Sequence, residues 1–320
     1  ASGADGEEAE WKLALSLAAE RAKGAESFWA PYVATLPTAP SSALALRLGD
    51  AQAVAVLPHG VADAAAGLRQ RAELLAAEAP EPELLLWALS IVWSRAFRLR
   101  GGGGAGAVKE TVEAVAALVP LCDAFNHSDS SEELLTSQGF DGFDYYVSTR
   151  QSVGEKTTAV NICYRAGATD AGLLLQYGFC LEENRHAEAQ ITIAGLCLVI
   201  ITRDAVGVLP YQRMLRLDVS ADDWKSAAQD VDAVDEPTAE EASSWEALLP
   251  ALLGGSVADV PAALRALEES LRTAERDLES SPSAAEHDLG PLAEHVLRLR
   301  STTRLLLRVA RGRLPWLLQS

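Results

Sequence analysis

Two short runs of the chain combine polar side chains with an apolar framework in a way that could support chemistry. The first, Leu118–Ser128, places Asn126 and His127 after an apolar stretch, and the second is an apolar run that ends in Tyr177. Amide, imidazole and phenol groups can hold a polar ligand through hydrogen bonds. Taken alone, Asn-His after an apolar run also describes a simple turn. Tyrosine on an apolar helix is by default a core residue whose hydroxyl has a partner.

Other common catalytic signatures do not occur in the sequence. Gly101–Gly104 has no following Gly-Lys-Ser/Thr and does not follow a strand pattern, so no phosphate-binding loop is predicted. There is no Gly-x-Ser-x-Gly elbow. The five histidines lack metal-ligand spacing, so we expect no metal site. The cysteines sit in apolar runs without Cys-x-x-Cys spacing, which is typical of buried, reduced thiols; they are Cys122, Cys163, Cys180 and Cys197.

The charge balance is acidic. The chain has 45 Asp and Glu residues against 27 Lys and Arg residues, a net charge of −18 over 320 residues. This argues against nonspecific binding to nucleic acid or anionic lipid, which needs cationic clusters. It permits docking to a basic partner, although simple solubility also explains it. The most apolar runs, Leu84–Trp93 and Ile191–Thr202, are too short to span a bilayer as helices, and no targeting signal is visible.

Periodicity and turn residues predict helices at both ends of the chain and strands between them. Residues 1–9 are expected to fray. Helices are predicted over residues 10–23, 62–79, 82–97, 109–118, 262–279 and 289–311. Strand-like runs occupy residues 143–148, 157–164 and 189–202, with a helical turn over 170–177. The chain is expected to return to helix from about residue 209, and the acidic segment 221–246 reads as a solvated loop.

The two runs resemble motifs of the SET-domain family, specifically the branch that includes the Rubisco large-subunit methyltransferases. That branch carries Leu-Val-Pro-x-x-Asp-x-x-Asn-His-Ser and a later Tyr-Gly-Phe followed by Asn-Arg, which match residues 118–128, 177–179 and 184–185. Flanking segments are similar as well: residues 10–15 and 27–32 look like the start of the family's helical insert, 93–97 like its last helix, and 280–289 like part of its helical substrate-holding domain.

The resemblance implies an α+β fold: a partial SET domain of small β-sheets with a large helical insert and an all-α C-terminal domain. It suggests the helical insert at residues 1–120, the C-terminal half of the SET domain at 121–207, and the helical substrate-binding domain at 208–320. Family members transfer a methyl group from S-adenosylmethionine to a lysine amine by direct displacement. The protein must align a neutral amine with the methyl group and exclude water.

The resemblance also implies roles for individual residues on the methyl-donor side. Tyr177 would be catalytic, with its hydroxyl beside the reacting amine and methyl group. Asn126 and His127 would hold the donor, chiefly through backbone and amide hydrogen bonds. Asp123 would support their loop, and Arg95 occupies a position that contacts donor or substrate in the family.

On the substrate side, the resemblance points to Ser94, Tyr145, Tyr146 and Glu188. Ser94 shares the position of a family contact residue, although it could equally pack the insert against the core. Tyr145 or Tyr146 would wall the lysine channel, where an aromatic face suits a cation. These neighbours alternate faces on a strand, so at most one can line a channel. Glu188 stands where the family usually has a tyrosine, and its carboxylate could attract a lysine.

Departures from the family pattern leave two functions open. The family's Gly-x-Gly segment is expected upstream of the point where this sequence begins, Arg165 replaces a glycine, and Asp170 replaces an asparagine. The first function is protein-lysine N-methyltransferase-like. The second is a catalytically inactive SET relic that acts as a structural subunit of a larger complex, with a partner protein covering an exposed SET edge. The resemblance implies a plastid location, or otherwise a soluble intracellular one.

Overall fold

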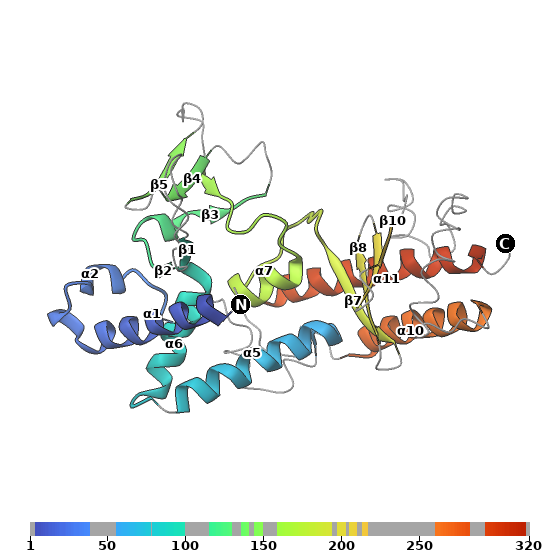
Figure 1. Ribbon diagram of the computed structural model, residues 1–320, viewed down its shortest axis with the longest axis horizontal. Coiled ribbons are helices and arrows are strands. Elements are labelled where there is room, and N and C mark those ends of the chain that lie inside the picture. The colour runs from blue at the N-terminus through green and yellow to red at the C-terminus, as the bar shows by residue number, and fades with distance from the viewer. Residues whose placement is uncertain are drawn as a thin grey trace. The chain divides into compact units, whose positions relative to one another are not determined.

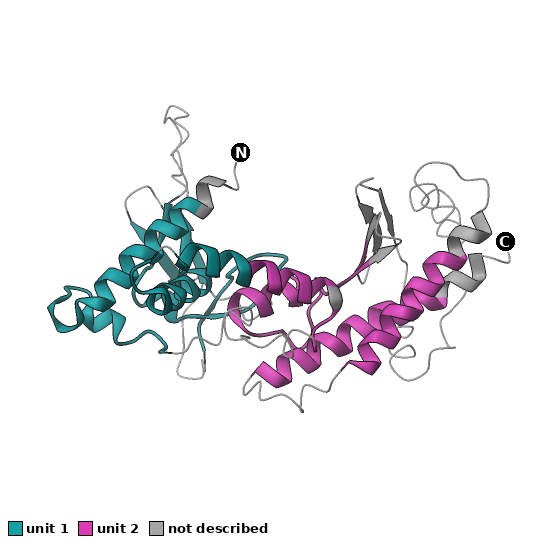
Figure 2. Cartoon of the chain, turned by 90° about the horizontal axis from the view of Figure 1, so that it is seen from below, with its two compact units in different colours: residues 1–46, 69–168 teal, residues 47–68, 169–320 magenta. Residues whose placement is uncertain are grey.

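The computed structural model shows an α+β protein (Figure 1). It describes residues 4–38, 56–77, 79–99, 115–129, 136–140, 144–149, 159–193, 197–202, 205–209, 213–216, 260–281 and 292–317. The chain forms two compact units, coloured in Figure 2. The first unit comprises residues 1–46 and 69–168, and the second unit comprises residues 47–68 and 169–320.

The first unit has a helical part whose core lies between α1 (Ala4–Ala22) and α6 (Pro82–Arg95). The proline at the start of α6 suits the first turn of a helix, where a backbone N–H has no partner in any case. After α1, Gly24 takes a positive φ of 57° and leads into the short helices η1 (Gly24–Glu26) and α2 (Ala30–Val33). The buried core side chains include Ala14, Leu17, Leu85, Leu89 and Ile91.

The strands that the structure describes in the first unit are short and form three two-stranded pairs. β1 (Phe97–Leu99) pairs with β2 (Val115–Ala117), and β4 (Thr136–Phe140) pairs with β5 (Tyr145–Thr149), both antiparallel. The helical turn η2 (Cys122–Ala124) leads into β3 (Asn126–His127), which pairs in parallel with β6 (Asn161–Ile162). Such short ladders supply few backbone hydrogen bonds, so the side chains around them must help to fix their position.

The second unit packs a four-stranded antiparallel sheet and α7 (Asp170–Tyr177) with two long helices. The order of the strands is β10 (Arg213–Arg216), β9 (Ala205–Leu209), β8 (Cys197–Thr202) and β7 (Glu188–Ile193). The helix α10 (Val260–Ser280) packs against α11 (Leu292–Leu317), and both contact β7. The buried side chains here include Leu173, Leu174, Val199, Ile201, Leu271, Val296 and Leu306.

An ionic cluster joins the two long helices. The side chain of Glu275 on α10 is only 7% exposed, and its carboxylate lies 2.5 Å from Arg308 Nε and 2.8 Å from Arg311 Nη1 on α11. Arg304 lies farther away, at 3.7 Å, and also pairs with Glu279. Several positive charges on α11 therefore compensate one buried carboxylate on α10.

The structure confirms the α+β fold class and several predicted elements. The helix over residues 170–177 has the predicted bounds, and β5 and the helices α6, α10 and α11 lie close to their expected positions. The helix α5 (His59–Ala77) begins three residues earlier than predicted, at His59 rather than residue 62. The acidic segment 221–246 and Gly101–Gly104 lie outside the described residues.

Other predictions of secondary structure are wrong. Residues 4–9 belong to α1 rather than to a frayed end, and the helix predicted over 109–118 contains strand β2 at Val115–Ala117. Strand β10 (Arg213–Arg216) occupies residues where helix was expected from about residue 209, whereas the strand-like run 189–202 does form strands, β7 and β8. In β2 and β10, pairing with a neighbouring strand overrides the predicted local preference for helix.

Candidate functional site

The Asn126–His127 segment is held in the first unit by parallel pairing with β6. Asn126 lies opposite Asn161, His127 lies opposite Ile162, and the backbone N–H of Ser128 donates to the Ile162 carbonyl at 3.1 Å. The side chain of Asn126 is exposed. This segment therefore presents one amide to the surroundings, while its backbone is tied to a neighbouring strand.

The His127 side chain helps to fix this segment. Its Nδ1 accepts a hydrogen bond from the backbone N–H of Tyr164 at 3.1 Å, and the two rings lie 5.2 Å apart. The Tyr164 hydroxyl in turn donates to the Phe125 carbonyl at 2.5 Å. Burial lowers the pKa of His127, although Asp129 and a hydrogen bond with the Ile162 backbone act in the opposite direction. The imidazole is thus held neutral and acts as an anchor.

Asp123 connects this segment to the helices of the first unit. Its carboxylate, 5% exposed, accepts a hydrogen bond from the Tyr32 hydroxyl at 2.8 Å and lies 3.6 Å from the guanidinium of Arg95. Arg95 also donates to the Asp123 backbone carbonyl at 2.8 Å. Burial and the neighbouring carboxylate both raise the pKa of Tyr32. Asp123 and Arg95 are therefore brought together, and they support the turn that precedes Asn126.

The same turn contains a strained residue. Leu121 has φ 72° and ψ −39°, and it is the one non-glycine residue with positive φ among those the structure describes. This conformation costs a leucine on the order of 1–3 kcal/mol, so surrounding contacts must hold it. The Asp123 N–H donates to Val119 and the Ala124 N–H to Leu121, which closes the turn.

Ser94 is on α6 one residue before Arg95. Its hydroxyl donates within the helix, to the Ser90 carbonyl at 2.8 Å and the Ile91 carbonyl at 3.2 Å. The side chain is half-buried. Its hydroxyl proton is thus used by its own helix, which leaves the oxygen lone pairs as the groups that could accept a further hydrogen bond.

Tyr145 and Tyr146 lie in different surroundings on β5. Tyr145 is half-buried, its ring is 4.6 Å from that of Phe97, and its hydroxyl donates to Gln138 at 2.9 Å. Burial, with a smaller effect from Cys122, raises the pKa of Tyr145 to about 12. Tyr146 is 50% exposed and faces Gly139, where an added Cβ would lie 2.5 Å from its hydroxyl oxygen. Tyr146 is therefore the more accessible of the two rings.

Tyr177 ends the short helix α7 in the second unit, and local sequence signals fix both ends of this helix. At its start, Thr169 Oγ1 accepts a hydrogen bond from the Gly172 N–H at 3.1 Å. At its end, Gly178 takes φ 83° and its N–H donates to the carbonyls of Leu173 and Leu174. Tyr177 is half-buried, and its ring lies 6.2 Å from that of Phe179.

A buried amide clamps the chain that follows α7. Asn184 Nδ2 donates to the Asp170 carboxyl group at 3.0 Å, and Asn184 Oδ1 accepts from the His186 N–H at 2.8 Å. Both Asp170 and Asn184 are 2% exposed. The Asn-Arg motif and the aspartate at position 170 thus form one structural clamp. This role was not anticipated from the sequence, and neither were the anchoring roles of Tyr32 and Tyr164.

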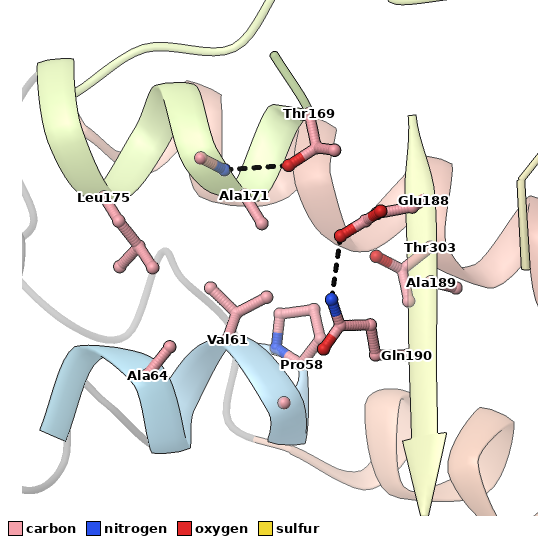
Figure 3. Close-up of a pocket in the computed structure, with 12 residues that line it drawn as sticks. Pro58, Val61, Ala64, Thr169, Ala171, Leu175, Glu188, Ala189, Gln190 and Thr303 are labelled. Atoms are coloured by element: carbon pink, nitrogen blue, oxygen red, sulfur yellow. Dashed lines mark hydrogen bonds between the residues drawn. The ribbon is translucent and has the colours of Figure 1, made fainter. Parts of the chain in front are cut away.

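Glu188 begins β7 and lines a pocket of about 190 Å³ in the second unit (Figure 3). Its carboxylate accepts a hydrogen bond from Gln190 Nε2 at 2.8 Å. Tyr177 is not among the residues that line this pocket. Of the candidate residues, Arg95, Ser94, Asp123, Asn126, His127, Tyr145 and Tyr146 belong to the first unit, and Tyr177 and Glu188 to the second.

The residues that the structure describes contain neither a grouping of metal ligands nor a membrane-spanning helix. In these segments no group of three or more His, Cys, Asp and Glu side chains is arranged to hold a metal ion. Within the same ranges, every helix is too short or too polar to cross a bilayer. Cys180 is buried as predicted, whereas Cys122 and Cys163, also expected to be buried, are half-buried.

The chain is similar to known proteins in its three-dimensional structure. The sequence matches no protein-family model and no curated protein sequence. The fold is similar to a structure of Rubisco LSMT bound to AdoMet, with a TM-score of 0.57, 14% identity, and coverage of 95% of this chain and 74% of the other. It is also similar to the SET domain of LSMT bound to lysine and AdoHcy, with a TM-score of 0.56, 16% identity, and coverage of 93% and 73%.

A third LSMT structure, bound to sinefungin and monomethyllysine, gives a TM-score of 0.52 at 14% identity and covers 93% of this chain. The agreement extends over both units rather than one motif. At 14–16% identity the likeness establishes the fold, and any catalytic activity must be argued from the individual side chains of this chain. The resemblance predicted from the sequence motifs is confirmed at the level of architecture: the chain has a SET-domain fold of the LSMT type.

Proposed function

We propose that this chain is a SET-domain protein-lysine N-methyltransferase-like protein that binds S-adenosylmethionine and acts on a lysine amine of a protein substrate. The observation that carries the proposal is the likeness of 93–95% of the chain to LSMT structures bound to AdoMet, AdoHcy, lysine or methyllysine. The Asn-His-Ser run at residues 126–128 and the Tyr-Gly-Phe run at residues 177–179 support it, because both match motifs of the family that the sequence resembles.

The residues around Asn126 fit such a donor. S-adenosylmethionine carries an adenine, an ammonium and a carboxylate, which require both hydrogen-bond donors and acceptors. The exposed Asn126 amide offers both, and the backbone of β3 is already fixed by β6. The side chain of His127 anchors the segment through Tyr164, so its contribution to the donor would come from its backbone.

The bound donor would supply an electrophilic methyl group, and the protein would supply positioning. Asp123 and Arg95 keep the turn before Asn126 in place through their mutual contacts. The Tyr177 hydroxyl would orient the lysine amine as a hydrogen-bond partner, and Tyr146 offers an accessible ring for the substrate side chain. Ser94 has lone pairs with which it could accept a hydrogen bond from the substrate.

The test is calorimetric titration of the purified chain with S-adenosylmethionine. We expect one-site binding that weakens about threefold to tenfold in Asn126→Ala, because one hydrogen bond contributes roughly 0.5–1.5 kcal/mol. Gln70→Ala, which removes an exposed amide from α5, should bind like the wild type. Tyr177→Phe should keep donor binding and lose methyl transfer to a lysine peptide library. A donor affinity that is equal in Asn126→Ala and the wild type would contradict this site.

The alternative is a catalytically inactive SET relic that serves as a subunit of a protein complex, for which a plastid location remains part of the hypothesis. Glu188 favours it, because the carboxylate stands where the resemblance implies an aromatic channel wall. A folded chain that shows no binding at millimolar donor, yet co-purifies with a defined protein partner, would establish this function and exclude the first. The division into 1–120, 121–207 and 208–320 is part of both proposals.

A further inference from the structure

The helix that carries Tyr177 is too short to hold its position alone. α7 has eight residues, a length at which an isolated helix is only marginally stable in water. Its buried side chains include Leu173 and Leu174, and it packs against α11 within the second unit (Figure 1). The position of the Tyr177 hydroxyl therefore depends on the contacts that support each end of α7.

Different groups support the two ends of α7. At the start, the Asp170 carboxyl group accepts a hydrogen bond from Asn184 Nδ2. Beyond the other end, Gly178 takes φ 83° and turns the chain, and Cys180 is buried, with 3% of its surface exposed. The three residues from Tyr177 to Cys180 span at most about 10 Å, so a displacement of Cys180 reaches Tyr177 through a short piece of chain.

Two side chains of α11 bind both backbone polar groups of Cys180. The Cys180 N–H donates to Nδ1 of His295 at 3.2 Å, and the Cys180 carbonyl accepts a hydrogen bond from Arg298 Nη1 at 3.2 Å. These two bonds are called the Cys180 contacts below. His295 and Arg298 are three positions apart, so they lie on one face of α11. The Cys180 thiol also lies 3.4 Å from the His295 backbone carbonyl.

Only the neutral form of His295 can make its part of the Cys180 contacts. Nδ1 accepts the Cys180 N–H when the proton of the imidazole is on Nε2. The imidazolium carries a proton on Nδ1 as well, so two donors would face each other. Protonation therefore removes the partner of a buried backbone N–H, which must find another acceptor or move.

The surrounding groups decide where His295 titrates. On α11, Arg298 is positively charged and pairs with the exposed Glu294 at 2.9 Å. The Cys180 thiol faces His295 from the segment after α7, and burial, together with Asp170, raises the pKa of this thiol, so it stays uncharged. Burial and Arg298 lower the pKa of His295, whereas Glu294 opposes them, so we expect protonation below about pH 6.5.

We propose that His295 and Arg298 are positioning residues for Tyr177, and that protonation of His295 releases the Cys180 contacts. The proposal rests on the proposed function in one respect, that Tyr177 orients the lysine amine. With the contacts formed, both ends of α7 are supported and the Tyr177 hydroxyl has one position. With the contacts released, only the start of α7 keeps its support, and the end that carries Tyr177 moves. The helix α11 thereby makes the orientation of Tyr177 sensitive to acid.

Nuclear magnetic resonance of the full chain, without donor or substrate, tests the link between the two residues. The ring signals of ¹³C-labelled tyrosine are followed from pH 7.5 to 5.5, and the Tyr177→Phe spectrum identifies the Tyr177 signal. In the wild type we expect this signal to shift along the titration curve of the His295 imidazole. In His295→Gln the shift should vanish, because the amide oxygen accepts the N–H and does not titrate.

Three further variants separate the Cys180 contacts from general effects, with circular dichroism to verify folding. His295→Ala removes the acceptor, so its Tyr177 signal at pH 7.5 should already match the acidic wild type. Arg298→Ala should displace the Tyr177 signal at pH 7.5 and raise the midpoint of His295, because a positive neighbour is lost. His186→Gln replaces an exposed imidazole of the same unit and should leave the titration unchanged.

Two results would overturn the proposal at this stage. The first is a wild-type Tyr177 signal that does not follow His295, or that shifts equally in a folded His295→Gln variant. The second is an Arg298→Ala spectrum identical to that of the wild type, which would remove Arg298 from the positioning role. Neither result depends on whether the chain transfers methyl groups.

Turnover measurements then connect the Cys180 contacts to the proposed reaction, with a peptide selected from the lysine peptide library as substrate. At pH 7.5, His295→Ala should lower kcat about tenfold to a hundredfold through misplacement of Tyr177, with an unchanged affinity for S-adenosylmethionine. His295→Gln should restore most of the rate. The ratio of wild-type kcat to that of His295→Gln cancels the titration of the lysine amine, and it should fall as the protonated fraction of His295 rises.

The turnover results distinguish the two proposals. Equal kcat values in His295→Ala and the wild type would overturn the positioning role, although the enzyme is active. If the wild type and all variants transfer no methyl group, the proposed function fails, and the Tyr177 signal alone decides whether α11 controls the position of Tyr177.

Discussion

The two units hold their candidate residues by different physical means. In the first unit, Asn126 and His127 lie on a two-residue strand, and side chains from remote parts of the sequence fix them. The bond from Tyr32 to Asp123 joins residues 91 apart, and the bond from Tyr164 to His127 joins residues 37 apart. In the second unit, Tyr177 lies at the end of a helix that is capped at both ends.

The difference shows where each candidate site is vulnerable. A short parallel ladder contributes little by itself, so the first unit depends on individual buried polar side chains. The second unit has a longer antiparallel ladder, a packed helix pair and buried aliphatic residues, with one buried amide clamp between Asp170 and Asn184. Loss of one polar anchor should therefore affect the first unit more strongly than the second.

The largest effect is expected for Asp123→Ala. The change leaves the Arg95 guanidinium and the Tyr32 hydroxyl without their shared partner, and should cost about 3 kcal/mol of unfolding free energy. Denaturant unfolding checks the cost. Hydrogen exchange should quicken at the Ser128 and Tyr164 amides, with little change at the amides of the second unit.

Two variants sharpen this result. Tyr32→Phe removes only the hydroxyl and should cost about 1 kcal/mol, because the ring remains packed. Glu26→Ala removes an exposed carboxylate of the same unit and should have little effect. If Asp123→Ala were no more destabilising than Glu26→Ala, the first unit would not depend on this anchor.

A smaller loss is expected for Asn184→Ala in the second unit. The change removes the amide that donates to the buried Asp170 and accepts from the His186 N–H, and should cost about 2 kcal/mol. Asn184→Asp should cost more, since it places a second carboxyl group next to Asp170. Exchange at the His186 and Ala187 amides measures the local effect. A loss larger than that of Asp123→Ala would reverse the comparison between the units.

The smallest effect is a pH dependence shared by both units. Nδ1 of His127 accepts the Tyr164 N–H, and Nδ1 of His295 accepts the Cys180 N–H. Burial lowers the pKa of both imidazoles; Arg298 acts in the same direction on His295, whereas Asp129 and Glu294 oppose the shifts. The unfolded chain, with histidine pKa values near 6.5, therefore binds more protons than the folded chain as the pH falls through that value.

The stabilisation that these neutral histidines provide should thus be present above about pH 6.5 and decline below it. Denaturant unfolding from pH 7.5 to 5.5 measures this slope. Replacing both residues by glutamine should flatten it, and the single variants should show whether His127, the more buried of the two, contributes more. An unchanged slope in the double variant would mean that other groups control stability in this range.

The sequence by itself determined the features that depend on neighbouring residues. Thr169 and Gly178 specify the bounds of α7 because each meets the requirement of a helix terminus locally. Aromatic and β-branched residues specify β5, and apolar periodicity specifies α10 and α11. The two motif runs also predicted the SET-domain architecture that the LSMT structures share with this chain.

Only the tertiary structure decided which distant groups meet. The strands β2, β9 and β10 form because a neighbouring strand supplies their hydrogen bonds, which local propensity does not reveal. The contact of Tyr32 with Asp123 likewise joins segments far apart in the chain. The motif residues Asn126 and Tyr177 were predictable as candidates, but the anchoring role of His127, the Asp170–Asn184 clamp and the pocket at Glu188 depend on buried partners that folding brings together.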